Sequence, residues 1–206
     1  MDQTAPDDTV SITVIGTGSA DAAPDVMRLQ AGVEVRARSA AEAFAAARAA
    51  AARLAGALGG AGIAPHDLRT TELSLGPEYE AYPKVSAYRA AQGVEAVVRD
   101  LERADHVIDT VAGVGEEARL HGIAFEVSDP EAALTAAREA AFRQAAARAA
   151  QYAGLAGRPL GRVVSISEEL QSPPVPMART MAAEDSVRPG RQAMHVTVRV
   201  GYAFDH

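Results

Sequence analysis

The five histidines are the first residues to test for chemistry, because imidazole can serve as a metal ligand, a general base or a proton shuttle. They are His66, His106, His121, His195 and His206. No two of them stand two or four residues apart, the spacings that put two ligands on one face of a strand or helix. His121 and His195 both fall on expected strands and could meet across a sheet, but we favour surface or hydrogen-bonded imidazoles. We therefore expect no metal site and no bound cofactor.

Carboxylates are the second candidates, because a close pair can act as general acid and general base. Glu78 with Glu80 and Glu168 with Glu169 are such pairs. Acidic pairs at strand ends are usually solvated, and the chain has neither a G-x-S-x-G elbow nor a cysteine to act as nucleophile. We predict no catalytic residue and a protein that is not an enzyme. An uncharacterised hydrolase or metal enzyme, assembled from residues far apart in sequence, is the last-ranked alternative.

The segment Gly16-Thr17-Gly18 invites comparison with loops that bind phosphate. Such loops place the phosphate on amides at a helix N-terminus, whereas Pro24-Asp25 leads here into a predicted strand. The context therefore favours a structural turn, in which glycine serves a positive φ angle or close packing.

Arg138 is the first of three candidate interaction residues. On an ideal helix it projects within about 40° of the packing face marked by Leu134, Ala141, Ala145 and Tyr152. A cation on a packing face can form a structural ion pair, contact a second subunit or hold an anion. The simpler interpretation is that its stem passes the small alanines and its head reaches water.

Met177 and Arg179 are the other two candidates, and they fall in a proline-rich stretch over residues 171–190. The sequence predicts an extended, mobile loop there, and a methionine among prolines can dock in the groove of a partner. A long connection between two terminal strands is the simpler alternative.

Composition limits the partners that the protein can have. The chain has 206 residues and a formal net charge of -7, which argues against binding to nucleic acid or to anionic membranes. No apolar run is long enough to cross a bilayer, so we expect no membrane insertion. Residues 1–8 are polar and acidic, so we expect a disordered tail without an export signal. This predicts a soluble, cytoplasmic protein, or a periplasmic or extracellular one if an export signal was removed.

The periodicity of apolar residues predicts an α+β fold over residues 9–206. Residues 26–127 should follow the order strand, helix, strand, strand, helix, strand, which is the split βαβ arrangement on an antiparallel sheet. Ser39 and Glu42 form a capping box at the first helix, and Gly76-Pro77 with Pro83 should bracket a hairpin turn. A first strand, a long helix that begins at Asp129-Pro130-Glu131, and a terminal strand pair remain. They either complete the same sheet or form a second, intertwined lobe.

These segments, in this order, resemble the SIMPL-domain family. The resemblance covers about residues 9 to 204, and the residues that carry it are Gly16-Thr17-Gly18-Ser19 with Ala23-Pro24-Asp25, Ala61-Gly62-Ile63 with Asp67-Leu68, Thr70-Thr71 and Leu75, Arg99-Asp100-Leu101, Gly122-Ile123-Ala124-Phe125, Asp129-Pro130, Leu160-Gly161-Arg162-Val163, and Pro173-Pro174 with Pro176-Met177-Ala178-Arg179. The family includes bacterial periplasmic immunogenic proteins that form ring-shaped or channel-shaped oligomers, and members linked to oxidative-stress tolerance. No catalytic residues are established for it.

The resemblance implies a non-enzymatic protein that acts as a scaffold or interaction protein and is tied to the stress response. We expect a homo-oligomer that assembles through its alanine-rich helices or its sheet edges. A small-molecule or peptide-binding module, with a cleft between two lobes, is the second hypothesis.

Overall fold

The computed structural model describes residues 10–169 and 189–205 of the chain. The expected tail over residues 1–8 lies outside the described residues, and so do Met177, Arg179 and residues 171–188 of the expected loop. The described chain divides into two compact units. We call residues 24–128 the inserted unit, and residues 10–23, 129–169 and 191–205 together the terminal unit.

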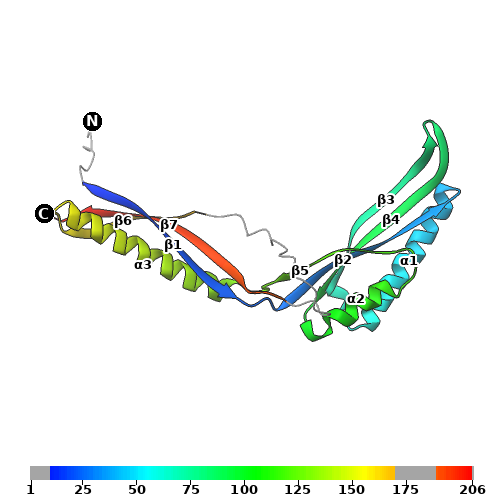
Figure 1. Ribbon diagram of the computed structural model, residues 1–206, viewed down its shortest axis with the longest axis horizontal. Coiled ribbons are helices and arrows are strands. Elements are labelled where there is room, and N and C mark those ends of the chain that lie inside the picture. The colour runs from blue at the N-terminus through cyan, green and yellow to red at the C-terminus, as the bar shows by residue number, and fades with distance from the viewer. Residues whose placement is uncertain (1–9, 170–188, 206) are drawn as a thin grey trace, which may run out of the picture. The chain divides into compact units, whose positions relative to one another are not determined.

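The inserted unit confirms the predicted α+β class and has a four-stranded antiparallel sheet (Figure 1). The strands lie in the order β3-β4-β2-β5, so a later strand separates β2 from β3, as the split βαβ arrangement requires. The strands are β2 (Val26–Ala37), β3 (Leu68–Ala81), β4 (Lys84–Val98) and β5 (Ala118–Glu126). The helices are α1 (Ala40–Gly60) and α2 (Ala104–Ala112). The short 3-10 turn η1 (Pro65–Asp67) lies between α1 and β3, and η2 (Leu101–Arg103) lies directly before α2.

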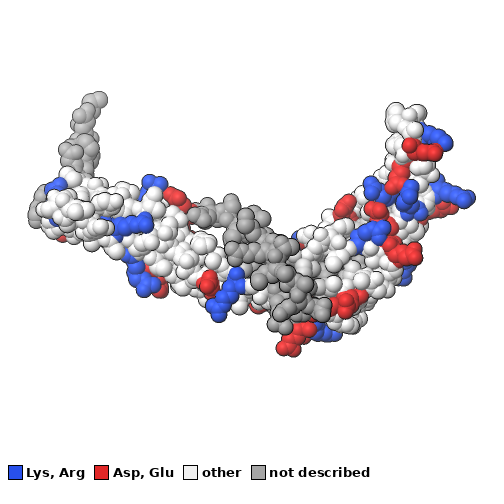
Figure 2. All heavy atoms as spheres, in the orientation of Figure 1, with Lys and Arg blue, Asp and Glu red and all other residues white. Residues whose placement is uncertain are grey.

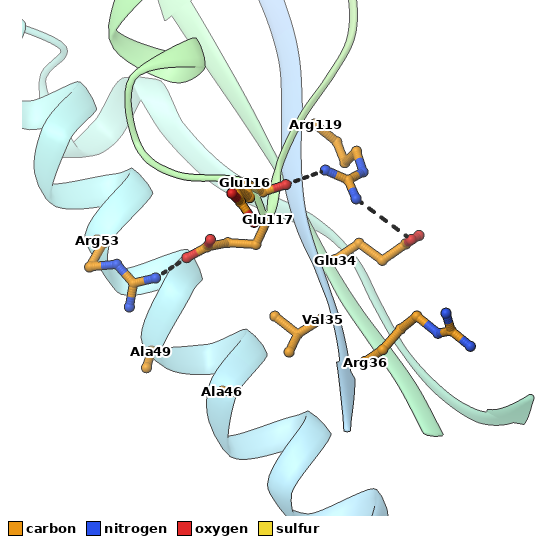
Figure 3. Close-up of a pocket in the computed structure, with 9 residues that line it drawn as sticks. All are labelled: Glu34, Val35, Arg36, Ala46, Ala49, Arg53, Glu116, Glu117 and Arg119. Atoms are coloured by element: carbon orange, nitrogen blue, oxygen red, sulfur yellow. Dashed lines mark hydrogen bonds and ion pairs between the residues drawn. The ribbon is translucent and has the colours of Figure 1, made fainter. Parts of the chain in front are cut away.

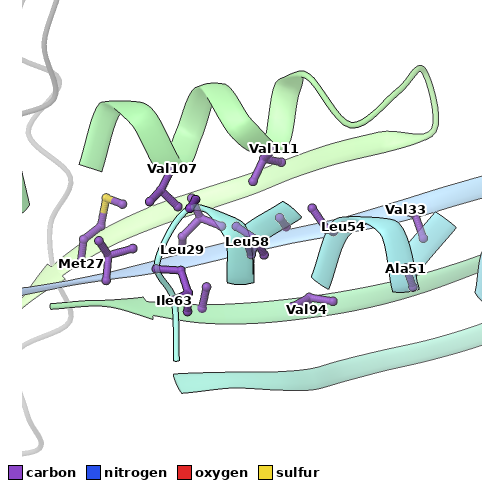
Figure 4. Packing of buried hydrophobic residues seen from close by; sticks show 14 of the residues in the cluster. Met27, Leu29, Val33, Ala51, Leu54, Leu58, Ile63, Val94, Val107 and Val111 are labelled. Carbon is purple, nitrogen blue, oxygen red and sulfur yellow. The ribbon is translucent and has the colours of Figure 1, made fainter. Parts of the chain in front are cut away.

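Helix α1 begins at the predicted capping box. The Ser39 hydroxyl accepts the Glu42 N–H at 3.2 Å, and the Glu42 carboxylate accepts the Ser39 N–H at 3.2 Å. Both helices turn their apolar side chains to one face of the sheet (Figure 4). The buried cluster there includes Met27, Leu29 and Val33 of β2, Leu54 and Leu58 of α1, and Val107 and Val111 of α2.

The predicted hairpin between β3 and β4 is present, and its turn lies at Pro83, one end of the predicted bracket, and not next to Gly76-Pro77. Gly76 and Pro77 are paired within β3, opposite Arg89 and Tyr88. The turn instead falls at the cis peptide bond between Tyr82 and Pro83. A proline is tolerated inside β3 because β3 is an edge strand, where a missing N–H breaks no ladder hydrogen bond.

The two ends of the inserted unit are joined by Asp25 and Ser128. The Asp25 carboxylate accepts the Ser128 N–H at 2.6 Å and the Ser128 hydroxyl at 2.5 Å. These hydrogen bonds, led by the one from the Ser128 hydroxyl, lower the pKa of Asp25. The strand that enters the unit is therefore tied to the strand that leaves it.

The strands of the terminal unit form a separate three-stranded sheet and do not extend the four-stranded one. Of the two arrangements that the periodicity allowed, the second lobe is the one present. The order is β1-β7-β6, with all pairs antiparallel, and the strands are β1 (Ser11–Ala22), β7 (Gln192–Phe204) and β6 (Leu160–Glu169). Helix α3 (Glu131–Leu155) covers one face of this sheet over β1 and β7 (Figure 1).

The Gly16–Gly18 segment is a correction to the sequence analysis, since it is part of β1 and not a turn. Neither glycine has a positive φ angle. Their role is close packing: a Cβ on Gly16 would lie 2.7 Å from the Ala145 nitrogen, and one on Gly18 would lie 2.9 Å from the Ala140 Cβ. The helix presents a buried ladder of alanines to the sheet, at Ala137, Ala141, Ala145, Ala149 and Ala153.

Side chains of α3 also occupy the outer edge of β1. The Gln144 amide oxygen accepts the Thr17 N–H at 2.8 Å, and Arg148 donates to the Ile15 carbonyl at 2.5 Å. This edge of the sheet is therefore partly satisfied by the unit's own helix, which protects it from pairing with another chain.

The close contact predicts that Gly18→Ala destabilises the protein. The added methyl forces α3 away from β1, so we expect the free energy of unfolding to fall by roughly 1–3 kcal/mol, measured by urea titration with circular dichroism. Gly154→Ala is the control, because a Cβ at this α3 position meets no atom within 4 Å. Equal unfolding midpoints for wild type and Gly18→Ala would contradict the packing role.

Candidate functional site

A groove of about 530 Å³ opens beside α1 in the inserted unit (Figure 3). It exists because α2 has 9 residues and α1 has 21, so α2 flanks only part of α1. Strand β5 is also shorter than β2, and its pairing with β2 ends at Val33. The groove is lined by Glu34, Val35, Arg36, Ala46, Ala49, Arg53, Glu116, Glu117 and Arg119.

The charges in this groove are largely paired with one another. Arg53 forms an ion pair with Glu117, and Arg119 lies 4.0 Å from the Glu34 carboxylate. Arg119 also donates to the Glu116 carbonyl at 2.8 Å. A hydrogen bond from its own backbone and the nearby Arg53 guanidinium lower the pKa of Glu117. Glu117 is therefore ionised at neutral pH and is no proton donor.

The lining of this groove is made of charged and small apolar side chains. None of its nine lining residues is a serine, threonine, histidine or lysine, so these nine provide no usual nucleophile or neutral base. What they offer is a rim of paired charges around the methyl groups of Ala46 and Ala49. Such a lining suits a polar, extended ligand.

The sheet face opposite the helices carries an ion-pair network that crosses all four strands. Glu95 of β4 accepts from Arg28 of β2 at 2.6 Å and from Arg69 of β3 at 2.9 Å. Arg28 also reaches Glu126 of β5 at 2.7 Å. The Glu95 side chain is only 5% exposed, because the two guanidinium groups cover it.

The pKa of Glu95 shows how strong this network is. Burial raises the pKa, but the hydrogen bonds from Arg69 and Arg28 lower it by more, so that it lies below its ordinary value. The carboxylate therefore stays charged in a site that water barely reaches. We assign this network to the stability of the sheet.

The β3–β4 hairpin carries the most exposed apolar surface of the inserted unit. The pairing of β4 with β2 ends at Tyr88, so the tip of the hairpin extends beyond the rest of the sheet. We define the hairpin surface as Leu73, Leu75, Tyr79, Tyr82 and Val85, all of which are exposed. Leu73 is 57% exposed and Tyr82 is 85% exposed. Around it, Figure 2 shows positive and negative side chains interspersed.

The coverage by α1 explains why these leucines are exposed. Helix α1 packs over β4 and β2, and a groove of about 270 Å³ separates it from β3. Its walls are Ala51, Ala52 and Ala55 of α1 and Leu68 and Thr70 of β3. Beyond Leu68, which packs against the buried cluster, the helix-side face of β3 is therefore left open.

Arg138 lies on α3, beside the buried alanine ladder and not in it. It forms ion pairs with Glu131 at 2.7 Å and with Glu168 of β6 at 3.1 Å. Hydrogen bonds to Glu131 and Glu168 raise the pKa of Arg138. Of the three roles considered for Arg138, the geometry contains the structural ion pair. A role of Arg138 in assembly stays a prediction.

The two histidines that were expected on strands belong to different units. His121 lies in β5 of the inserted unit, whereas His195 lies in β7 of the terminal unit, so they belong to different sheets. Within residues 10–169 and 189–205, no group of three histidine, aspartate or glutamate side chains is placed to hold a metal ion. The helices of the same part of the chain include none that is long and apolar enough to span a bilayer.

The sequence analysis missed both grooves and the Glu95 network. The partners of Glu95 lie 67 and 26 residues away in sequence, and no local spacing relates them. One signal was present: Arg28, Arg69 and Glu95 each fall on the polar side of an alternating strand, so their pairing could be found once the strand order was known.

The family model for SIMPL, described as a protein of unknown function (DUF541), matches residues 12–202. The chain belongs to the SIMPL family. The resemblance seen in the sequence is thereby confirmed.

Two named relatives accompany the SIMPL match. The 26 kDa periplasmic immunogenic protein of Brucella melitensis biotype 1 is 32% identical over 210 residues, which cover 92% of this chain and 82% of that protein. The uncharacterized protein YggE of Escherichia coli strain K12 is 32% identical over 179 residues, covering 84% of this chain and 72% of that protein. Neither name carries an enzymatic activity.

The Glu95 network predicts that Glu95→Gln destabilises this SIMPL protein by roughly 1–3 kcal/mol at neutral pH, because Arg28 and Arg69 lose a buried carboxylate. Glu80→Gln is the control, since Glu80 is 65% exposed in its pair with Lys84. This substitution should change the free energy of unfolding by less than about 0.5 kcal/mol.

The pH dependence tests the same network. Because the folded pKa of Glu95 lies below the ordinary 4.5, its contribution is present above pH 4.5 and is lost as pH falls through the folded pKa. The difference in unfolding midpoint between wild type and Glu95→Gln should therefore narrow in acid. A difference that stays constant from pH 7 down to pH 3 would refute a charged Glu95 as its cause.

Proposed function

We propose that this SIMPL protein is a non-enzymatic interaction protein that assembles with copies of itself. The observation that carries the proposal is the hairpin surface, where five large apolar side chains are exposed on an edge strand and its hairpin. Such a surface on an edge strand tends to recruit a partner, because pairing satisfies the backbone and buries the side chains together. The family resemblance, with its ring-shaped and channel-shaped assemblies, supports the same conclusion.

The second candidate function is a small-molecule or peptide-binding module. The groove beside α1 supports it, because the groove lies within a single unit and combines an alanine floor with paired charges. An enzyme ranks last, since the lining residues of this groove include no usual nucleophile.

We propose the periplasm as the location, because the Brucella relative is named a periplasmic protein. The cytoplasmic location expected from the sequence has no support from the relatives. A role in the stress response stays an expectation from the family resemblance.

Arg138 is retained as a proposed contact residue of the assembly, and Met177 and Arg179 as further predictions in the chain outside the described residues. The case for Arg138 is its position between α3 and β6, where it is 40% exposed and two carboxylates hold its guanidinium.

Light scattering of the purified protein across a concentration series tests the proposal. We expect a mass that is a stable multiple of 21.4 kDa. A monomer at every concentration would reject self-assembly and direct attention to ligands of the α1 groove.

The same measurement tests Arg138. Arg138→Ala should reduce the assembled fraction more than Arg143→Ala, whose side chain donates to the carbonyl of Glu139. Equal assembled fractions for the two variants would leave Arg138 with a structural role alone.

A further inference from the structure

We propose that two copies of this chain pair through β3, antiparallel and centred on Ser74, so that their four-stranded sheets become one sheet of eight strands. The inference rests on the proposed self-assembly and names its contact. No strand among the described residues pairs with the outer edge of β3.

The strand register shows which backbone groups face that edge. The Glu34 N–H donates to the Glu117 carbonyl, so the backbone N–H and C=O of Glu34 point to β5. Those of the next residue, Val35, therefore point to β4. Ala90 stands opposite Val35, so its backbone groups point to β2. The backbone groups of its neighbours Arg89 and Ala91 therefore point to β3.

The pairing of β4 with β3 carries this alternation outward. Gly76 and Ser74 stand opposite Arg89 and Ala91, so their backbone groups point inward. The backbone groups of Leu73, Leu75 and Pro77 then point outward, so that the N–H groups of the two leucines and the C=O groups of all three residues are free of the ladder. The position of Pro77 agrees, because a proline nitrogen is tolerated only at an outer edge.

The usable part of this edge is short and is centred on Ser74. The register shifts between Thr70 and Glu72 and again between Glu78 and Tyr79, and Pro77 offers no donor. Residues 72–76 are the regular, proline-free stretch that remains. A two-fold axis at Ser74 places Leu73 opposite Leu75 of the second copy and pairs their outward N–H and C=O groups.

Side-chain chemistry favours this register over its neighbour. Leu73, 57% exposed, and Leu75, 47% exposed, lie on the side that α1 leaves open, so four leucines would meet across the axis. Glu72 would face Gly76 of the second copy, with no like charges opposed. A shift by two residues that centres the axis on Leu75 would instead place Glu72 opposite Glu78, which is destabilising.

The contrast with the terminal unit supports β3 as the contact edge. There, Gln144 and Arg148 of α3 bind backbone groups on the outer edge of β1. No described side chain does the same for Leu73 or Leu75, whose apolar groups would be buried by a second copy. A two-fold contact of this kind is self-complementary and closes on itself.

Paired charges test the register. In Leu73→Lys/Leu75→Lys, each lysine faces a lysine of the second copy, whereas in Leu73→Lys/Leu75→Glu each lysine faces a glutamate. Both variants lose the same two leucines, and both substituted positions are exposed in the monomer. Both variants should therefore fold, which circular dichroism checks. We expect the dissociation constant of the Lys/Lys variant to exceed that of the Lys/Glu variant roughly tenfold. Equal constants would overturn the register.

A disulfide tests the axis directly, because the natural chain contains no cysteine. Paired Ser74 residues form a non-hydrogen-bonded pair with Cα atoms about 4.5 Å apart, within the range that a disulfide bridges. Ser74→Cys should give a covalent dimer with oxidised glutathione, and Glu80→Cys, at the hairpin tip, should not. If the wild type assembles but the Ser74→Cys variant does not cross-link, the β3 contact alone is overturned. A monomeric wild type overturns the proposed function with it.

Discussion

Close approach of alanine-rich helices to the sheets is the constraint on which both units depend. Aromatic residues make up 4% of the chain and tryptophan is absent, so few side chains can fill a wide gap between layers. In the terminal unit the gap is closed by alanines of α3 that lie against Gly16 and Gly18. In the inserted unit the buried face of α1 combines Ala43, Ala47, Ala50 and Ala51 with two leucines. The methyl groups provide contact only where the backbones come close.

A helix that packs this closely covers a narrow band of its sheet. Helix α3 lies over β1 and β7 and leaves Ile166 of β6 61% exposed. Helix α1 lies over β4 and β2 and leaves Leu73 and Leu75 of β3 exposed to water. Apolar strand surface at one side of each sheet is thus a direct result of how the cores are filled. The proposed assembly uses that surface, whereas ion pairs on the face opposite the helices connect the four strands of the inserted sheet.

Much of the local structure could be predicted because it is encoded locally. Ser39 and Glu42 are three residues apart, and the alternation in β2 and β7 is unbroken. Gly16-Thr17-Gly18 was misassigned because a glycine selected for contact with α3 looks the same in sequence as one selected for a turn. Gly76-Pro77 misled for a related reason, since the tolerance of β3 for proline depends on its place at the sheet edge. The Glu95 network and the α1 groove depend on strand order and on relative helix length, which no local pattern contains.

The place of β7 in its sheet has a consequence for synthesis on the ribosome. Strand β7 is the middle strand, and it pairs Ala203 with Ser11, at opposite ends of the chain. Strand β1 is made first, yet its partner strand is made last, whereas every strand of the inserted unit is complete by residue 126. At about 5–20 residues per second, the inserted unit has several seconds to fold before β7 exists. The terminal unit therefore completes its sheet only once β7 has been made, and loss of Gln192–Phe204 would leave β1 and β6 without the strand that joins them.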